Sequence, residues 1–176
     1  MSERWMLALV VVIVLCTLGL TKFRPVVHTR TTLKGAELAL RHLQEWAKWM
    51  AGVQVAALGG LALLVFDQSG ARRQMGKWET FFALACFVLL GLGLFCAAWV
   101  LSSLASHAIR IYGFPEAAKQ SPSVGDCFDI YEQPLYDFQL RHGKPHIKLG
   151  DVVTLQHWLW ALGLAALGGH VVASFL

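Results

Sequence analysis

Charged residues are scarce in this sequence, and four long stretches contain none of them. Asp, Glu, Lys and Arg make up 15% of the 176 residues and hydrophobic residues 56%, whereas a soluble domain carries about 25% charged residues. This composition excludes an ordinary soluble domain. It predicts an all-α membrane protein, one integral membrane domain built as a bundle of four transmembrane helices. The predicted spans are residues 5–21, 49–66, 80–106 and 152–176, and the segments outside the membrane are 22–48 and 107–151.

The spans also lack the ionisable groups that transport chemistry requires. Secondary transporters, proton relays and ion pathways place such groups near the middle of the bilayer. Gln54, His157 and His170 are the strongly polar side chains of these spans. Transport is therefore disfavoured, and an oligomeric pore or membrane effector is kept as an alternative.

Catalytic signatures are absent as well. The sequence contains no GxSxG, GxxxxGK[ST], HExxH or GxGxxG motif, so we expect no enzyme. The acidic residues of 126–137 have no base, nucleophile or metal ligands around them, which favours a solvated face. The four cysteines form no CxxC and no disulfide-like framework.

The stretch from Leu33 to Phe66 organises the rest of the chain. It contains no proline, its first half alternates polar and apolar residues at helical spacing, and its second half carries no charge. As one helix of about 34 residues it is roughly 50 Å long, longer than the hydrocarbon core of about 30 Å. We predict a transmembrane helix that continues as a cytoplasmic amphipathic extension.

The extension has an apolar stripe that must lie against something apolar. The candidates are lipid headgroups, the segment 107–151, or a partner subunit. We predict that 107–151 is a loop of roughly 45 residues between the third and fourth helices. A loop of this length is unusual unless it is functional or disordered, and its aromatic residues argue against full disorder. The predicted partner-binding surface comprises Leu33, Leu40, Leu43, Phe128, Tyr131 and Tyr136.

The first apolar stretch, residues 5–21, is short for a span. A signal peptide with Arg4 as its positive region is the alternative. No small-x-small cleavage site follows the apolar core, and Lys22 and Arg24 come directly after it. We therefore expect a retained anchor.

Lys and Arg are distributed unequally between the two sides of this topology. Eleven of the 15 lie in 22–48 and 107–151, and the other four lie in the N-terminal tail and in 67–79. Because cytoplasmic segments carry the excess, we predict a bacterial inner-membrane protein with both termini on the non-cytoplasmic side. The net charge of +4 follows from this bias and does not indicate nucleic-acid binding.

Small residues recur every four positions in two spans. Such lines let helix backbones approach closely, which is how helices associate in lipid. We predict helix packing there, within the chain in preference to a partner, with chance as the alternative. The residues are Gly52, Ala56 and Gly60 in the second span and Ala161, Ala165 and Gly169 in the fourth.

Seven histidines raise the hypothesis of a b-type haem, which membrane bundles hold between two histidines on facing helices. His157 and His107 are the pair whose predicted depths match. Hydrogen bonding of these rings to loops or headgroups is the favoured interpretation. His142 and His146 lack further ligands for zinc, and we predict no metal site.

These observations together predict a small membrane protein that acts by contact, as an accessory, scaffolding or partner-binding subunit of a membrane complex. Its expected partners are membrane lipids and other membrane protein subunits or a second copy. A haem-binding electron-transfer subunit is the first alternative and the pore is the second.

Overall fold

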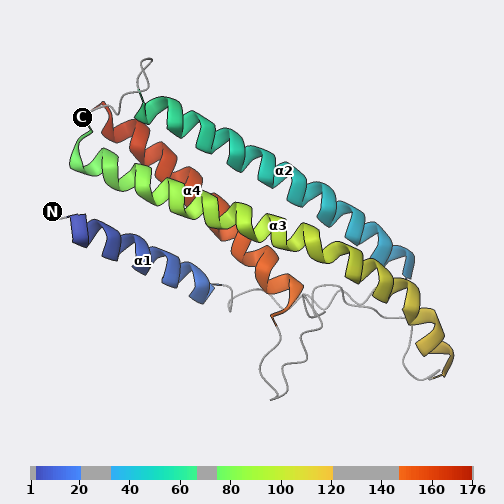
Figure 1. The fold of residues 1–176 in the computed structure, drawn as a ribbon. Helices are drawn as coiled ribbons and strands as arrows, with labels where there is room; N and C mark the ends of the chain where they lie inside the picture. The colour runs from blue at the N-terminus through green and yellow to red at the C-terminus, as the bar shows by residue number, and fades with distance from the viewer. Residues whose placement is uncertain (1–2, 21–32, 67–74, 121–146, 176) are drawn as a thin grey trace.

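The computed structural model describes residues 3–20, 33–66, 75–120 and 147–175, and these form four helices (Figure 1). α3 is the central helix: it packs extensively against α4 and α2, while α1 lies against α3 and α4. The predicted all-helical bundle is confirmed. The helices are α1 (Glu3–Leu20), α2 (Leu33–Val65), α3 (Lys77–Gln120) and α4 (Leu149–Ala173).

Three helices are long and apolar enough to cross a membrane. The segments concerned are Gly35–Val65, Lys77–Ile109 and Leu149–Ala173, and the apolar segment of α1, Ala8–Gly19, is shorter. Large apolar side chains point outward from these helices, as lipid contact requires. Val55, Phe87, Phe95 and Val172 are each about 60% exposed.

α3 and α4 begin with the same N-terminal hydrogen bond. The backbone N–H of Gly76 donates to Glu79 Oε2 at 2.6 Å, and that of Lys148 donates to Asp151 Oδ2 at 3.3 Å. The carboxylate in the first turn satisfies an N–H that the helix leaves without a partner, and its charge suits the helix N-terminus. Glu79 thus starts α3 at Lys77, three residues before the uncharged stretch.

The far end of α3 differs from the sequence prediction. The third predicted span ended at Ser106, but α3 continues to Gln120. The first part of 107–151 is therefore helix and not loop. His107, one residue past the uncharged run, is buried, which shows that α3 has packing partners beyond that run. The remainder of the predicted loop, 121–146, lies outside the described residues.

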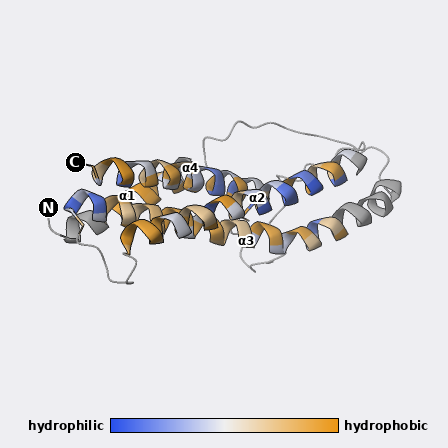
Figure 2. Ribbon diagram, turned by 90° about the horizontal axis from the view of Figure 1, so that it is seen from above, coloured by the Kyte–Doolittle hydropathy of each residue, from blue (hydrophilic) through white to orange (hydrophobic). Residues whose placement is uncertain are grey.

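The apolar stripe of the first half of α2 packs inside the chain. Ala36, Leu43 and Ala47 are at most 4% exposed and share one core cluster with Leu104 of α3 and Leu149 of α4. Figure 2 shows hydrophilic residues along this half of α2, where α2 and α3 run together past the end of α4 (Figure 1). We call residues 33–48 of α2 and 104–120 of α3 the helical arm.

Candidate functional site

The two faces of α2 have opposite character. Met50, Gln54 and Leu61 are at most 4% exposed and face the bundle. At 100° per residue, Gly52 and Ala56 lie on the opposite side of the helix, and both are exposed.

The outward face of α2 contains a continuous line of small residues. Gly52, Ala56 and Gly59 follow one another along it and are all exposed. A Cβ built at Gly52, Gly59 or Gly60 would have nothing within 4 Å. We call Gly52, Ala56 and Gly59 the outward small-residue line. Its two ends are marked by Trp49 and Leu63, which are 59% and 82% exposed.

The predicted lines of small residues therefore differ in position. Gly60 is half-buried, and no atom of the described residues lies within 4 Å of a Cβ built at Gly52 or Gly60. In the fourth span Ala165 is exposed and Ala161 half-buried. Gly169 contacts another helix, because the Phe82 ring lies where its Cβ would be, at 2.8 Å.

Two glycines that contact another helix closely were not predicted from the four-residue spacing. A Cβ on Gly163 would overlap the Leu90 side chain, and one on Gly93 would overlap the amide of Gln54. Both glycines are buried, so α3 and α4 approach closely at Gly163, and α2 and α3 at Gly93. The signal that could have found them is a glycine facing a large side chain, which spacing within one helix cannot show.

Polar amides lie in the interior of the bundle. Gln54 and Gln156 are fully buried, and within the described chain neither amide makes a hydrogen bond. An amide in an apolar interior without a hydrogen bond costs roughly 1–3 kcal/mol. Contacts with the described residues therefore do not explain why these two amides are buried.

Aromatic rings join α2 to α4 where the arm begins. The rings of Trp46 and His157 stack at 6.5 Å with 22° between planes, and Trp49 and Trp160 lie 6.2 Å apart. His157 also lies 6.0 Å from Trp160. Amphipathic rings of this kind collect at the membrane–water interface, and this cluster lies beside Lys48, the last charged residue of α2.

The predicted haem pair lies in two different environments. His107 is fully buried, and its Nδ1–H donates to the carbonyl of Ser103 at 2.7 Å. His157 is exposed and stacks on Trp46.

The two histidines also differ in depth. Gly93 of α3 lies beside Leu159 of α4, with 3.6 Å from its built Cβ to the Leu159 Cβ. From that level His107 is about 21 Å further along α3, and His157 about 3 Å along α4 in the same direction. The histidines are therefore separated by about 18 Å along the bundle, and the structure does not bring them together. No three His, Cys, Asp or Glu side chains of the described residues could hold a metal ion.

The residues predicted to form one partner-binding surface do not share one environment in the structure. Leu43 is 4% exposed in the core, and Leu40 is half-buried against it. Leu33 begins α2. Phe128, Tyr131 and Tyr136 lie outside the described residues. The apolar stripe is thus covered by this chain itself, whose third helix is longer than predicted.

Comparison of the chain with protein-family models, with curated proteins and with solved structures gave no match.

Proposed function

We propose that the protein is a partner-binding subunit of a membrane assembly and that a helix of its partner packs on the outward small-residue line of α2. The observation that carries the proposal is the direction of this line. Gly52, Ala56 and Gly59 lie opposite the face that packs on α3, with open space where a Cβ would be at both glycines.

Helices in lipid associate without a hydrophobic driving force between them. Lipid tails are as apolar as Leu, so association depends on close packing and on backbone approach at small residues. A line of small side chains between the larger Trp49 and Leu63 forms a shallow surface, or seat, on which a second helix can pack. This chain fills no part of that seat among its described residues.

The same face of α2 continues into the helical arm with charged residues. Arg41 and Glu45 are exposed there, on the same side of the helix as Gly52. Charges beside an apolar contact select the partner and fix its register more than they add affinity. The proposed surface therefore has an apolar part in the bilayer and a charged part outside it.

The proposed membrane setting has four spans, with α1 as the first of them. The positive-inside bias supports a bacterial inner membrane, with the helical arm in the cytoplasm and both termini on the other side. In this setting the charged part of the surface meets a partner in the cytoplasm.

Leucine at both glycines of the line tests the proposal. The double variant Gly52→Leu with Gly59→Leu should lose the partner, because two large side chains occupy the seat of its helix. Crosslinking in native membranes followed by mass measurement in mild detergent detects the loss. Gly168→Leu is the matched control, since Gly168 is an exposed span glycine with open space around its Cβ.

Wild type and Gly168→Leu should both run as a complex heavier than the 19.4 kDa chain, and the double variant as the chain alone. A wild-type protein that is monomeric and crosslinks to nothing in its own membrane would contradict the proposal.

A further inference from the structure

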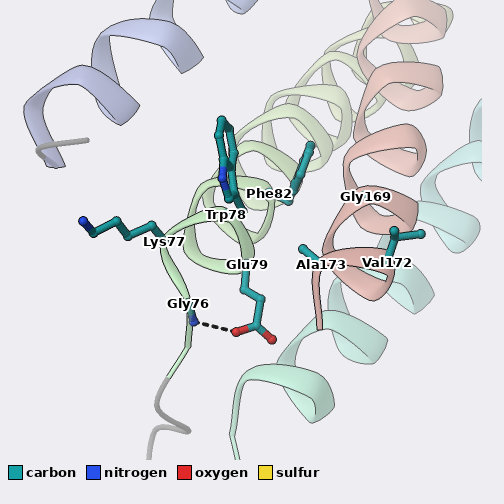
Figure 3. A pocket seen from close by; sticks show the side chains of 8 residues that line it. All are labelled: Gly76, Lys77, Trp78, Glu79, Phe82, Gly169, Val172 and Ala173. Carbon is teal, nitrogen blue, oxygen red and sulfur yellow. Dashed lines mark hydrogen bonds between the residues drawn. The ribbon is translucent and has the colours of Figure 1, made fainter. Parts of the chain in front are cut away.

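A groove of about 700 Å³ opens between the first turn of α3 and the last turns of α4 (Figure 3). It lies at the end of the bundle remote from the helical arm, on elements that the outward small-residue line does not include. Its lining is mostly apolar, with one acidic and one basic residue. The lining residues are Gly76, Lys77, Trp78, Glu79, Phe82, Gly169, Val172 and Ala173.

The groove lies where the apolar helices end, which is the level of lipid headgroups. Lys77 is the first residue of α3 and Ala173 the last of α4, so the groove begins at the membrane boundary and runs inward toward Phe82 and Gly169. Trp78 is 60% exposed, as is typical of an aromatic residue at a membrane interface.

The two charges of the lining occupy different places. Glu79 is 8% exposed, and its side chain extends from α3 toward the end of α4, whereas the exposed Lys77 extends away from α4 (Figure 3). The Oε2 of Glu79 accepts the Gly76 N–H at 2.6 Å, which holds the carboxylate at the mouth of the groove. The lining thus carries its negative charge at the mouth, between the two helix ends, and its positive charge on the side that faces away from α4 (Figure 3).

A contact between the helices holds the walls of the groove in place. The Nδ1–H of His170, 2% exposed, donates to the backbone carbonyl of Glu79 at 3.0 Å. The Phe82 ring fills the place of a side chain at Gly169. These contacts fix the first turn of α3 to α4, so the groove is formed before a ligand arrives, and a preformed site loses less entropy on binding.

We propose that this groove binds one phospholipid with a primary-amine headgroup, such as phosphatidylethanolamine. Its ammonium group donates hydrogen bonds to the Glu79 carboxylate, its phosphate faces Lys77, and an acyl chain lies along Phe82 and Val172. The charges decide the headgroup. A choline headgroup has no N–H to donate, and a headgroup that carries only negative charge has nothing to match Glu79.

Native mass spectrometry tests the proposal. The full chain is reconstituted in nanodiscs of phosphatidylethanolamine and phosphatidylcholine in equal amounts with identical acyl chains, then released into mild detergent. One charge-assisted hydrogen bond predicts a preference of about tenfold or more for phosphatidylethanolamine adducts. Glu79→Gln should reduce this preference to about one, while the glutamine oxygen still accepts the Gly76 N–H.

Glu37→Gln is the matched control, because Glu37 is a half-buried glutamate of the helical arm, remote from the groove. It should leave the preference unchanged. Ala173→Phe fills the groove from α4 while leaving Glu79 in place, and it should abolish the adducts of both lipids. Circular dichroism confirms that each variant is folded.

Three results would overturn the proposal: equal binding of the two lipids by wild type, an unchanged preference in Glu79→Gln, or retained adducts in Ala173→Phe. A stronger signal from phosphatidylglycerol than from phosphatidylethanolamine would overturn it too, since it would assign binding to Lys77 alone. None of these results depends on the outward small-residue line, so the lipid site and the proposed function can fail separately.

Discussion

Gly163 lies where α4 meets the Leu90 side chain of α3. A Cβ there would be 2.7 Å from Leu90 Cγ and 3.4 Å from the Leu90 backbone nitrogen, so the side chain alone cannot make room by a small rotation. Gly163→Ala should lower stability by about 1–3 kcal/mol, as overpacking of a core does. Thermal unfolding in detergent, followed by circular dichroism, measures the effect.

The control for this change is Gly168→Ala, on the same helix with open space around the added Cβ. It should be neutral or stabilising by up to about 1 kcal/mol, because Ala favours helix over Gly. If Gly163→Ala unfolded at the same temperature as Gly168→Ala, the close contact of α3 with α4 at this position would be wrong.

Gln54 contributes a buried amide that the described chain leaves without a hydrogen bond. Gln54→Met keeps the length of the side chain and removes the desolvated polar atoms, so it should stabilise the protein by about 1–3 kcal/mol. The same melting experiment measures it. Gln44→Met is the control, since Gln44 is exposed on the same helix and its change should have little effect. A lower melting temperature for Gln54→Met would show that the amide binds a polar group.

At this scale the sequence predicts which residues share a face but not where the face points. The four-residue spacing placed Gly52 with Ala56, and the structure turns both outward. It placed Gly169 in an equivalent line, and that residue packs on Phe82. Gly, Ala and Leu are equally compatible with lipid and with another helix, so hydropathy carries no information about direction.

At the scale of elements, the helical arm is stabilised by the apolar stripe of α2. Leu43 is 4% exposed and Leu38, five residues earlier on the same helix, is 56% exposed. Leu43→Ala should cost about 2–5 kcal/mol of stability because it leaves a cavity between α2 and α3. Leu38→Ala should cost far less, and comparing chemical unfolding of the two variants tests the pairing.

Equal stability of the two alanine variants would contradict the packing of α2 against α3 in the helical arm, because it would mean that Leu43 packs on nothing.

The length of α2 was predicted from its periodicity and its lack of proline. The extension of α3 was not, because Pro115 and the charges after Ser106 are local signals for a helix end. α3 nevertheless continues as one helix to Gln120, and packing partners from distant sequence, such as those that bury His107, cannot be inferred from local signals.

For the whole molecule, hydropathy predicted the helical membrane class because uncharged runs of this length have few other solutions. It did not predict the relative levels of the helices. The depth matching of His107 with His157 assumed that α3 ends where its uncharged run ends. The level is instead set by contacts such as Gly93 with Leu159, and side-chain fit between helices determines those.

The number of membrane crossings depends on α1. α1 has 18 residues, a length of about 27 Å, slightly less than the hydrocarbon thickness of about 30 Å. Its Val11 and Leu15 are more than half exposed, as expected for a helix that faces lipid. Figure 1 places both termini at one end of the bundle. We therefore expect reporter fusions at the two termini to lie on the same, non-cytoplasmic side.

The helical arm supplies the internal control for this topology. A cysteine at Glu45, in a variant whose native cysteines are serine, should react with an impermeant thiol reagent only from the cytoplasm. A non-cytoplasmic C-terminus combined with a cytoplasmic N-terminus would reduce the spans to three. Both ends of α1 would then lie on the cytoplasmic side, because the helical arm that follows it is also there. A helix with both ends on one side does not cross the membrane, so α1 would lie against α3 and α4 without spanning.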